Sequence, residues 1–369
     1  MKAVFFANTD WYLYNFRLAY AEFLQQQGWE VVFISPDGEH AQKLKEAGFR
    51  HVPFEFSRKG INPFQESETI QGIKRLYEEE KPDLVHHFTI KCVIYGSLAA
   101  KELGIKAIIN SITGLGYTFL SNKPHIRVIR EVVKHLYKKA LADTQVIFEN
   151  PDDRQLFLEM DLVQETNSSI VLGTGINTER FKPEPPPNSV PLTILPARMI
   201  WDKGIGEFVE AAGMIRESGV KARFALIGNN DTGNPTCIPF DKLSQWQKEG
   251  NVEWWGWQED VATVISMSHI VCLPSYREGL PKILIEAASC GRPIVTTDVP
   301  GCREVVEDGV NGYLVPEKNA EALKDALLKL IEDPEAREAM GKASREIAIQ
   351  KFSDEIVNNG IYAVYQKVI

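Results

Sequence analysis

Hydrophobic residues in the first half of the chain gather in short runs, and longer amphipathic segments separate these runs. Seven of the runs have the length and composition of buried strands: residues 3–8, 30–36, 51–56, 84–88, 106–112, 145–150 and 169–175. The segments between them carry apolar residues at helical spacing, and several end at a glycine: 16–28, 40–48, 68–80 and 93–104. Repeated strand–helix steps of this kind predict an α/β domain with a doubly wound parallel sheet.

The pattern is interrupted once and then repeats. Residues 175–191 contain five prolines and no periodicity, which predicts an interdomain linker. New strand runs follow, again separated by helical segments: 192–198, 222–229, 252–257, 269–275, 293–298 and 312–316. The expected division is a Rossmann-like domain over 1–176, a linker over 177–190, a second Rossmann-like domain over 191–352 and a C-terminal helix over 353–369 that packs back on the first domain. Two such domains leave a cleft between them, where a ligand is expected to bind.

Composition narrows the class of protein. The chain has 369 residues, of which 44% are hydrophobic and 25% charged, as in a soluble globular protein. Its net charge of −9 argues against nucleic acid as a partner. The five cysteines are scattered without metal-ligand spacing, which fits a reducing compartment. The chain begins directly with a strand-like segment and has no apolar run long enough to span a membrane, so we expect a cytoplasmic protein.

Two common nucleotide-binding motifs are absent. A dinucleotide-binding turn needs G-x-G-x-x-G directly after a strand, but the first strand is followed by NTDWYLYNF, which has no glycine. The segments GTGINT and KGIGEF lack the third glycine, and no G-x4-GK[ST] phosphate loop occurs. The sequence therefore argues against a dinucleotide-dependent dehydrogenase and against a P-loop enzyme.

Charged residues instead follow successive strands of the second domain. Arg198 and Lys203 come after its first strand, and Gly228 ends the next. Glu278 and Glu286 lie eight residues apart, where a loop enters a helix. Because parallel strands end at one edge of a sheet, we expect these residues to meet there. Cations beside a helix N-terminus suit a diphosphate, whereas carboxylates need hydroxyl groups from which to accept hydrogen bonds, so the set predicts a nucleotide-sugar site.

The motifs R-x4-KG at 198–204 and E-G-x-P-x4-E at 278–286, on two tandem Rossmann-like domains, resemble the family 4 glycosyltransferases of the GT-B fold. The likeness runs over essentially the whole chain. Stretches such as YNFRLAYAEFL, SITGLGYTF and LGTGINTERFKP resemble the capsular and lipid-linked oligosaccharide branch, and the PglA-type N-acetylgalactosaminyltransferases in particular. Those enzymes add a sugar to an undecaprenyl-diphosphate-linked acceptor.

The resemblance implies a catalytic and donor-binding role for four charged residues. Arg198 and Lys203 would hold the donor diphosphate and offset the charge of the leaving UDP. Glu278 would contact hydroxyls of the transferred sugar, and Glu286 would accept from the ribose hydroxyls. The other donor-binding candidates lie at strand ends or at the helix start: Gly228, Trp257, Val261, Gly279 and Leu280.

The resemblance also implies an acceptor side in the first domain, where the loop Asn8–Phe16 would line the cleft. The acceptor-side candidates are Asn15, Arg17, His86, His87, Thr113 and Gly114. Many relatives carry a histidine after the fifth strand, near the reacting sugar, but here Thr113 stands at that place, so the role of that histidine is not assigned. His86 and His87 lie at a strand end and are candidates for substrate contact, with partly buried structural histidines as the alternative.

The resemblance implies chemistry that retains the anomeric configuration. No D-x-D occurs anywhere in the chain, so we expect no metal at the diphosphate and no cofactor apart from the UDP-sugar as co-substrate. Arg198, Lys203 and helix dipoles would stabilise the leaving group instead.

One helical segment, residues 121–143, is strongly basic in an otherwise acidic protein. Its cations alternate with apolar residues, and the membrane-binding candidates are Lys123, Arg127, Arg130, Lys134 and Lys138. A basic amphipathic helix suggests docking on an anionic lipid surface. The alternative is a surface helix whose apolar stripe packs on the sheet while its lysines are solvated.

Together these features predict a transferase that moves a sugar, such as N-acetylgalactosamine or another N-acetylhexosamine, from a UDP-sugar to a polyprenyl-diphosphate-linked saccharide. We expect it to work as a monomer or weak dimer, peripherally bound at the inner face of a bacterial membrane. Two alternatives stay open: a UDP-sugar epimerase on the same scaffold, and a non-catalytic sugar-nucleotide-binding subunit of a polysaccharide complex. Turnover without an acceptor would favour the first, and a Glu278→Gln variant without a phenotype would favour the second.

Overall fold

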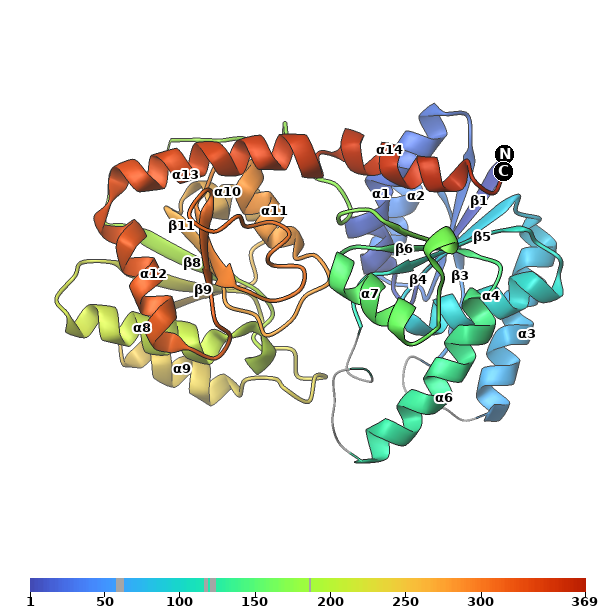
Figure 1. Ribbon diagram of the computed structural model, residues 1–369, viewed down its shortest axis with the longest axis horizontal. Helices are drawn as coiled ribbons and strands as arrows, with labels where there is room; N and C mark the ends of the chain where they lie inside the picture. Colours follow the sequence, from blue (N-terminus) through green and yellow to red (C-terminus); the bar gives the residue numbers. More distant parts are fainter. Residues whose placement is uncertain (58–62, 116–118, 120–123, 186) are drawn as a thin grey trace. The chain divides into compact units, whose positions relative to one another are not determined.

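The computed structural model describes residues 1–57, 63–115, 119, 124–185 and 187–369. The chain forms two compact units, of which unit 1 comprises Met1–Gly175 and Asp354–Ile369 and unit 2 comprises Ile176–Ser353. Each unit is an α/β domain built on a parallel sheet (Figure 1). The fold class predicted from the alternation of strand and helix patterns is therefore confirmed.

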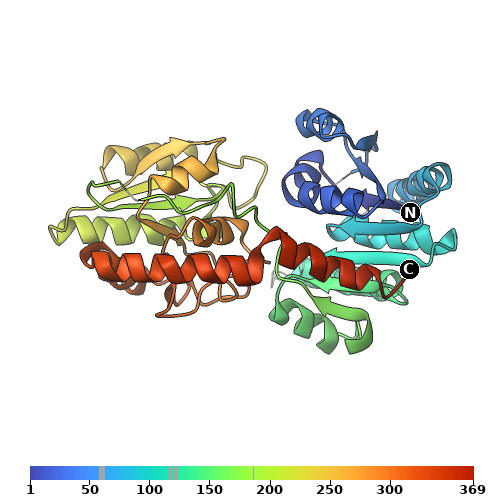
Figure 2. The ribbon, with the colours of Figure 1, turned by 90° about the horizontal axis from the view of Figure 1, so that it is seen from above.

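The sheet of unit 1 has the strand order β3-β2-β1-β4-β5-β6-β7. Its strands are β1 Lys2–Phe6, β2 Glu30–Ser35, β3 Arg50–Pro53, β4 Leu84–Phe88, β5 Ala107–Ile112, β6 Gln145–Phe148 and β7 Ser168–Ile170. The helices are α1 Asp10–Gln26, α2 Glu39–Glu46, α3 Pro63–Glu80, α4 Ile90–Glu102, α6 Pro124–Leu141, α7 Pro151–Glu159, the 3₁₀ turn η1 Glu165–Asn167 and α14 Asp354–Tyr365. One apolar core joins the sheet to α3, α4, α6 and α7, and a second joins it to α1, α2 and α14 (Figure 2). The central strands β4 and β5 are buried on both faces, as expected for a doubly wound sheet.

Helix α14 belongs to unit 1 although it lies at the end of the chain. Val357, Ile361 and Val364 are almost fully buried in the same core as Tyr20 and Leu24 of α1. The apolar stripe of this helix, which recurs at helical spacing, therefore completes one side of the first domain.

Helix α1 begins earlier than the sequence pattern suggested. Thr9 has an extended backbone, and its Oγ1 accepts a hydrogen bond of 3.1 Å from the N–H of Tyr12, which caps the helix. Asp10 adds a negative charge in the first turn. The expected loop Asn8–Phe16 is therefore wrong from Asp10 onward, and the Thr-Asp pair was the signal that could have shown the helix start.

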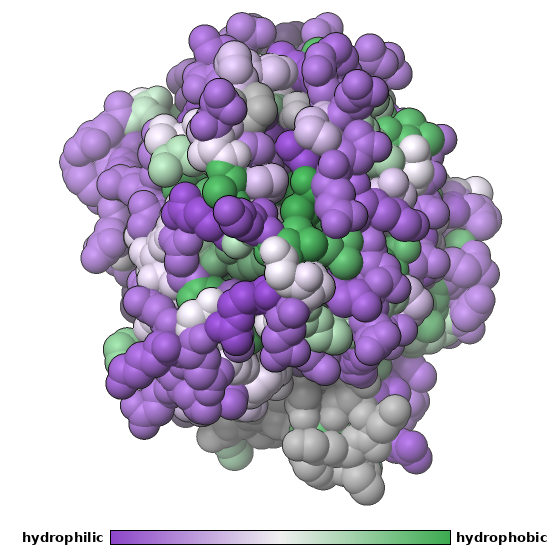
Figure 3. Space-filling view, turned by 90° about the vertical axis from the view of Figure 1, so that its left-hand side faces the viewer, coloured by the Kyte–Doolittle hydropathy of each residue, from purple (hydrophilic) through white to green (hydrophobic). Residues whose placement is uncertain are grey.

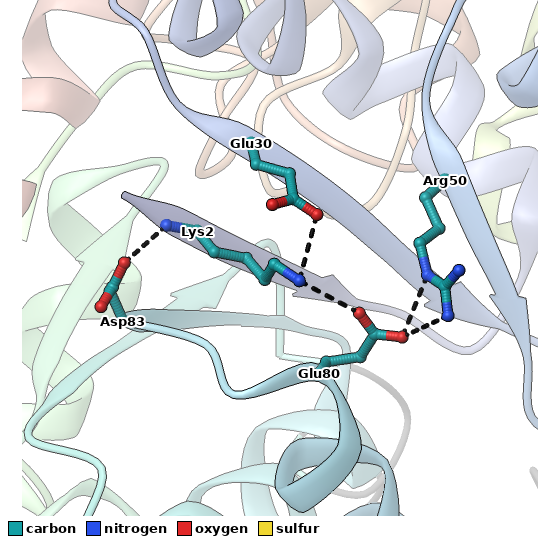
Figure 4. Close-up of polar contacts among 5 residues, drawn as sticks. All are labelled: Lys2, Glu30, Arg50, Glu80 and Asp83. Atoms are coloured by element: carbon teal, nitrogen blue, oxygen red, sulfur yellow. Dashed lines mark hydrogen bonds and ion pairs between the residues drawn. The ribbon is translucent and has the colours of Figure 1, made fainter.

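An ion-pair cluster ties together the amino ends of the first three strands (Figure 4). Lys2 Nζ lies 3.1 Å from Glu30 Oε1 and 3.5 Å from Glu80 Oε2, and Arg50 Nη2 lies 2.7 Å from Glu80 Oε1. The main-chain N–H of Lys2 also donates to Asp83 at 2.7 Å. These charges hold strand starts in register, so this edge of the sheet has a structural role.

The sheet of unit 2 has the strand order β10-β9-β8-β11-β12-β13. Its strands are β8 Leu192–Pro196, β9 Arg223–Ile227, β10 Glu253–Gly256, β11 Ile270–Leu273, β12 Ile294–Thr297 and β13 Gly312–Val315. The helices are the 3₁₀ turn η2 Trp201–Lys203, α8 Ile205–Glu217, α9 Phe240–Lys248, α10 Val261–Ser266, α11 Lys282–Ser289, α12 Ala320–Glu332, α13 Pro334–Ile347 and the π-helical turn η3 Ala348–Phe352. The face shown in Figure 3 is mostly hydrophilic, with apolar residues in small separate groups.

The start of the proline-rich stretch packs on unit 2. Phe181 is 5% exposed, and its carbonyl accepts from Ser289 Oγ at 2.6 Å and from Arg345 Nη1 at 2.9 Å. The residues before the prolines are thus anchored between the end of α11 and helix α13, which gives the expected linker a fixed attachment to the second domain.

Candidate active site

The carboxyl edge of the unit 2 sheet gathers the residues predicted to bind the donor. Arg198 and Lys203 follow β8, Gly228 follows β9, Trp257 follows β10 and Glu278 follows β11. These four strands are adjacent in the order β10-β9-β8-β11, so the loops that follow them leave the sheet side by side. The edge of a parallel sheet where such loops meet is the usual place for a ligand.

Lys203 and Glu278 form an ion pair at the centre of this edge. Lys203 Nζ contacts Glu278 Oε1, and Ser275 Oγ donates to the same oxygen at 2.7 Å. Both side chains are mostly buried, at 18% and 13% exposure. The sequence predicted one residue for phosphate and the other for sugar hydroxyls. The structure shows that they are 75 positions apart in sequence and form one unit, in which each charge orients the other.

Gly204 allows the two loops of this pair to come together. It has a φ of +69°, and a Cβ at this position would lie 2.0 Å from the carbonyl oxygen of Pro274. A larger residue would separate the loop after β8 from the loop after β11. The glycine of the K-G motif thus brings Lys203 within reach of Glu278.

Arg198 lies at the same edge but in a more open setting. Its side chain is 61% exposed, and its Nη1 lies 2.8 Å from Asp231 Oδ2. An exposed pair of this kind is weak, so the guanidinium can exchange its partner for an incoming anion at little cost. Gly228 has a φ of +134°, and a Cβ there would lie 2.1 Å from the carbonyl oxygen of Ala197, so the strand end after β9 packs directly against the main chain that carries Arg198.

Trp257 and the residues after it form the loop between β10 and α10. The N–H of Trp257 donates to Asn229 Oδ1 at 3.1 Å, and its side chain is 60% exposed. Val261 is the first residue of α10, which Asp260 caps through a hydrogen bond to the N–H of Thr263. On the neighbouring loop, Gly279 is half-buried and Leu280 is 9% exposed, directly before α11.

Glu286 lies in the middle of α11, next to the buried residues Leu284 and Ala287. Burial raises the pKa of its carboxyl above the usual range, and the charges of Lys282 and Arg180 oppose that shift. A half-buried carboxylate of this kind is suited to accept from ligand hydroxyls.

A cavity of about 350 Å³ lies one helical turn beyond Glu286. Its lining is polar and comes from the linker, α10 and the end of α11: Arg180, Lys182, Glu184, Asp260, Ala262, Thr263, Ser266 and Cys290. The charge of Arg180 acts on both Glu286 and Asp260. Arg180 was not among the predicted site residues, because residues 177–190 were predicted to be a linker. The two cations on either side of the apolar Phe181, Arg180 and Lys182, were a signal that could have drawn attention to this segment.

His86 and His87 are core residues of unit 1, and their predicted contact with substrate is wrong. Both are 0% exposed. His86 bonds the hydroxyls of Tyr365 and Ser111, each at 2.7 Å. His87 bonds the Tyr77 hydroxyl at 2.9 Å, and burial lowers the pKa of His87 to about 4. The structural alternative therefore holds, since both imidazoles are neutral and already hydrogen-bonded within the protein.

The other acceptor-side candidates differ in accessibility. Arg17 is only 2% exposed, so its predicted place as a cleft-lining side chain is wrong. Asn15 is half-buried, and its Nδ2 donates to the carbonyl of Trp11 at 2.9 Å. Thr113 and Gly114 directly follow β5 and are half-buried at the carboxyl edge of the unit 1 sheet.

Two glycosyltransferase family models match the chain. The model described as "Glycosyl transferase 4-like" matches residues 2–150, and the model described as "Glycosyl transferases group 1" matches residues 177–347. The matched segments together span most of the chain, and each falls within one of its two α/β units. The chain therefore belongs to the glycosyltransferases built from these two domains, and the predicted family is confirmed.

Individual relatives are similar over most or all of their length. The chain is 28% identical to the N,N'-diacetylbacillosaminyl-diphospho-undecaprenol alpha-1,3-N-acetylgalactosaminyltransferase of Campylobacter jejuni, in an alignment that covers 100% of this chain and 99% of the relative. It is 23% identical to the UDP-Gal:alpha-D-GlcNAc-diphosphoundecaprenol alpha-1,3-galactosyltransferase of Escherichia coli, over 74% of this chain and 73% of the relative. Among solved structures, the Anabaena protein HepE in complex with UDP superposes with a TM-score of 0.81 at 17% identity, covering 100% of both chains. That likeness confirms the GT-B fold.

Proposed function

We propose that this glycosyltransferase moves a sugar, with retention of anomeric configuration, from a UDP-sugar to a saccharide linked to a polyprenyl diphosphate. The main observation that supports a UDP-sugar donor is the Lys203–Glu278 ion pair at the carboxyl edge of the unit 2 sheet. Helix α11, which contains Glu286, begins at the same edge. A cation for phosphate and carboxylates for hydroxyls are the groups that a nucleotide sugar requires. The names of the Campylobacter jejuni and Escherichia coli relatives support the acceptor class. The former also supports an N-acetylhexosamine as the transferred sugar.

The proposed step is driven by stabilisation of the leaving group. The bond between the sugar C1 and the diphosphate oxygen breaks, a bond from C1 to an acceptor oxygen forms, and the acceptor proton leaves with the released UDP. Lys203 and Arg198 stabilise the negative charge that develops on the diphosphate. Glu278, already oriented by Lys203 and Ser275, accepts from a hydroxyl of the transferred sugar.

We assign the nucleoside to the part of the same sheet edge that lies beside Glu286. Glu286 accepts from the ribose hydroxyls, and the polar cavity beside Arg180 and Thr263 takes up adjoining parts of the nucleoside. In the part of the chain that the structure describes, His, Cys, Asp and Glu side chains form no cluster that could hold a metal ion. The proposed chemistry uses Lys203 and Arg198 for the charge of the diphosphate.

A UDP-release assay with a panel of UDP-sugars tests this function. We expect UDP release to require both a UDP-activated sugar and a polyprenyl-diphosphate-linked saccharide, with an N-acetylhexosamine donor preferred. Conversion of a UDP-sugar to its epimer without acceptor would replace the proposal with the epimerase alternative. Tight UDP binding with no turnover of any donor would favour a non-catalytic subunit.

We further propose that α6 of unit 1 brings the enzyme to the membrane surface that carries its acceptor. Arg127, Val128 and Val132 are exposed on one side of this helix, with Val128 at 69% and Val132 at 50%. Lys134 pairs with Glu131 at 3.1 Å and Lys138 pairs with Asp161, so these two lysines also have structural partners. Lys123 lies outside the described residues. No helix in the described ranges has the length and hydropathy to cross a membrane.

A further apolar side chain is exposed on the same side of the sheet. Phe64, in the first turn of α3, is 82% exposed. Helices α3 and α6 both pack against α4. Each runs antiparallel to the strands, so their first turns lie at the carboxyl edge of the sheet. Exposed apolar side chains next to cations are typical of a surface that inserts shallowly into lipid.

Charge reversal on α6 should weaken binding to anionic vesicles. Each basic side chain near such a surface contributes about 1 kcal/mol, so the triple variant Arg127→Glu, Arg130→Glu and Lys134→Glu is expected to lower vesicle co-sedimentation at least about tenfold. The matched control reverses three exposed lysines of unit 2, Lys248, Lys342 and Lys351. Equal loss of binding in the two triple variants would show a general charge effect and remove α6 from the proposal.

A further inference from the structure

A tyrosine two residues before Glu278 anchors the loop between β11 and α11 to the rest of unit 2. The N–H of Tyr276 donates to the carbonyl of Asp202 at 2.9 Å, in the 3₁₀ turn η2 that also contains Lys203. The Tyr276 hydroxyl donates to Oε1 of Glu207 at 2.8 Å. Glu207 lies in the first turn of α8, directly after that turn. Tyr276 therefore joins the loop of Glu278 to the segment of Lys203 through both its main chain and its side chain.

The ring of Tyr276 also contacts a lysine from the far edge of the sheet. Lys318 follows β13, and its Nζ lies 4.7 Å from the centroid of the Tyr276 ring. Helix α12 begins two residues after Lys318 and packs against α8 (Figure 1). Both partners of the Tyr276 side chain thus come from the starts of two helices that pack on each other, which gives the loop a firm support.

The carboxylate of Glu207 is only partly satisfied by its contact with Tyr276. Its Oε2 atom is buried and has no hydrogen-bond partner among the residues that the structure describes. A buried oxygen without a partner costs stability, so stability alone does not account for a carboxylate at this place. A charged acceptor does, however, make a shorter and stronger hydrogen bond than a neutral one. The carboxylate therefore favours a precise position of Tyr276.

The position of the Glu278 carboxylate depends on the loop that Tyr276 holds. Ser275, the residue before Tyr276, donates from Oγ to Glu278 Oε1 at 2.7 Å, and Lys203 contacts the same oxygen. The side chains of Ser275 and Glu278 thus meet at Lys203, whereas Tyr276 between them contacts Glu207. A shift of Tyr276 would move Ser275 and Glu278 together relative to Lys203. Small displacements of groups that contact a reacting substrate lower its rate strongly.

We propose that Tyr276 and Glu207 are positioning residues for sugar transfer, whose hydrogen bond holds the loop of Glu278 at the distance from Lys203 that the transferred sugar requires. This inference rests on the proposed function, because it takes Glu278 as the residue that contacts the sugar. Tyr276 and Glu207 act through Glu278, and Lys318 supports the ring of Tyr276 from the other side.

Removing either half of the hydrogen bond should lower the kcat of sugar transfer about fivefold to tenfold, the range for one lost hydrogen bond. Tyr276→Phe removes the donor, and Glu207→Ala removes the acceptor. Glu207→Gln keeps an oxygen that accepts from Tyr276, so its kcat should stay within about threefold of wild type. Tyr313→Phe is the matched control, since Tyr313 is another half-buried tyrosine of unit 2 with a lysine, Lys329, over its ring at 5.0 Å.

Two further readouts separate positioning from a general loss of structure. UDP lacks the sugar that Glu278 contacts, so the affinity for UDP, measured by titration calorimetry, should stay within about twofold of wild type in Tyr276→Phe and Glu207→Ala. In a Glu278→Ala background, Tyr276→Phe should cause no further loss of kcat, because Tyr276 acts through Glu278.

The outcomes separate this inference from the proposed function. If wild type transfers sugar but Tyr276→Phe and Glu207→Ala keep kcat within about twofold, the inference fails and the function stands. A further loss from Tyr276→Phe in the Glu278→Ala background would also overturn it, as would a loss of UDP affinity as large as the loss of kcat. If wild type transfers no sugar from any UDP-sugar to a lipid-linked acceptor, the proposed function itself fails. Should Tyr276→Phe not fold, Glu207→Ala and Glu207→Gln still decide, since equal losses in the two would contradict the inference.

Discussion

Replacing Lys203 with alanine is expected to lower the turnover of sugar transfer about 10²- to 10³-fold, the range for losing one preorganised donor to a developing anion. The structure supplies two reasons for an effect of this size. The ammonium group is mostly buried, so its interaction with a diphosphate is little screened by water. Its loss also leaves Glu278, which is only 13% exposed, without the cation that orients it.

Stopped UDP-release assays, run with saturating donor and acceptor, measure this effect as kcat. Lys221→Ala, on a loop of the same unit, is the matched control and should stay near wild type. The double variant Lys203→Ala with Glu278→Gln should lose much less kcat than the product of the two single effects, because the side chains act as one pair.

Arg198→Ala should also lower kcat, about 10²-fold. Near-wild-type turnover in both Lys203→Ala and Arg198→Ala would overturn the assignment of the leaving-group site.

The fold could be predicted because its signals are local. Short apolar runs alternate with amphipathic segments, and this spacing alone defines strands, helices and two parallel sheets. The meeting of the predicted donor-binding residues was also predictable, since loops that follow neighbouring parallel strands must meet at one edge. The pairing of Lys203 with Glu278 was not predictable, because it depends on the close approach of two loops at Gly204 and Pro274.

The errors in the predicted acceptor side have a common physical cause. The end of β4 was correctly expected at the carboxyl edge, but a strand position does not show which way each side chain points or what covers it. His86 is covered by Tyr365, a partner 279 positions away in sequence that arrives with α14. Arg17 is likewise satisfied by Glu149, 132 positions away. Burial that depends on such distant contacts cannot be predicted from the local sequence pattern. The earlier start of α1, by contrast, could have been predicted from the capping residue Thr9.

The second large effect is expected at Glu286, where alanine should weaken UDP binding about tenfold to a hundredfold. A carboxylate that accepts from two ribose hydroxyls makes two charge-assisted hydrogen bonds. The loss of each costs about 1.5–3 kcal/mol of binding free energy, and water recovers part of this cost in the variant by hydrogen-bonding to the ribose. Isothermal titration with UDP and with 2′,3′-dideoxy-UDP isolates this contact. Wild type should prefer UDP, and Glu286→Ala should bind the two ligands equally. Glu210→Ala, an exposed glutamate on α8, is the matched control and should keep the wild-type preference.

The pH dependence of UDP binding gives the same contact a second test. Because burial raises the pKa of Glu286, its carboxylate takes up a proton at a higher pH than an exposed glutamate would. A protonated carboxyl accepts hydrogen bonds less strongly, so UDP affinity in wild type should fall as the pH falls through that raised pKa. In Glu286→Ala this component should be missing, while the component from the phosphate groups of UDP remains in both proteins. If the variant loses affinity but keeps the preference for ribose hydroxyls, Glu286 acts through the shape of the cavity beside Arg180 and does not contact the ribose.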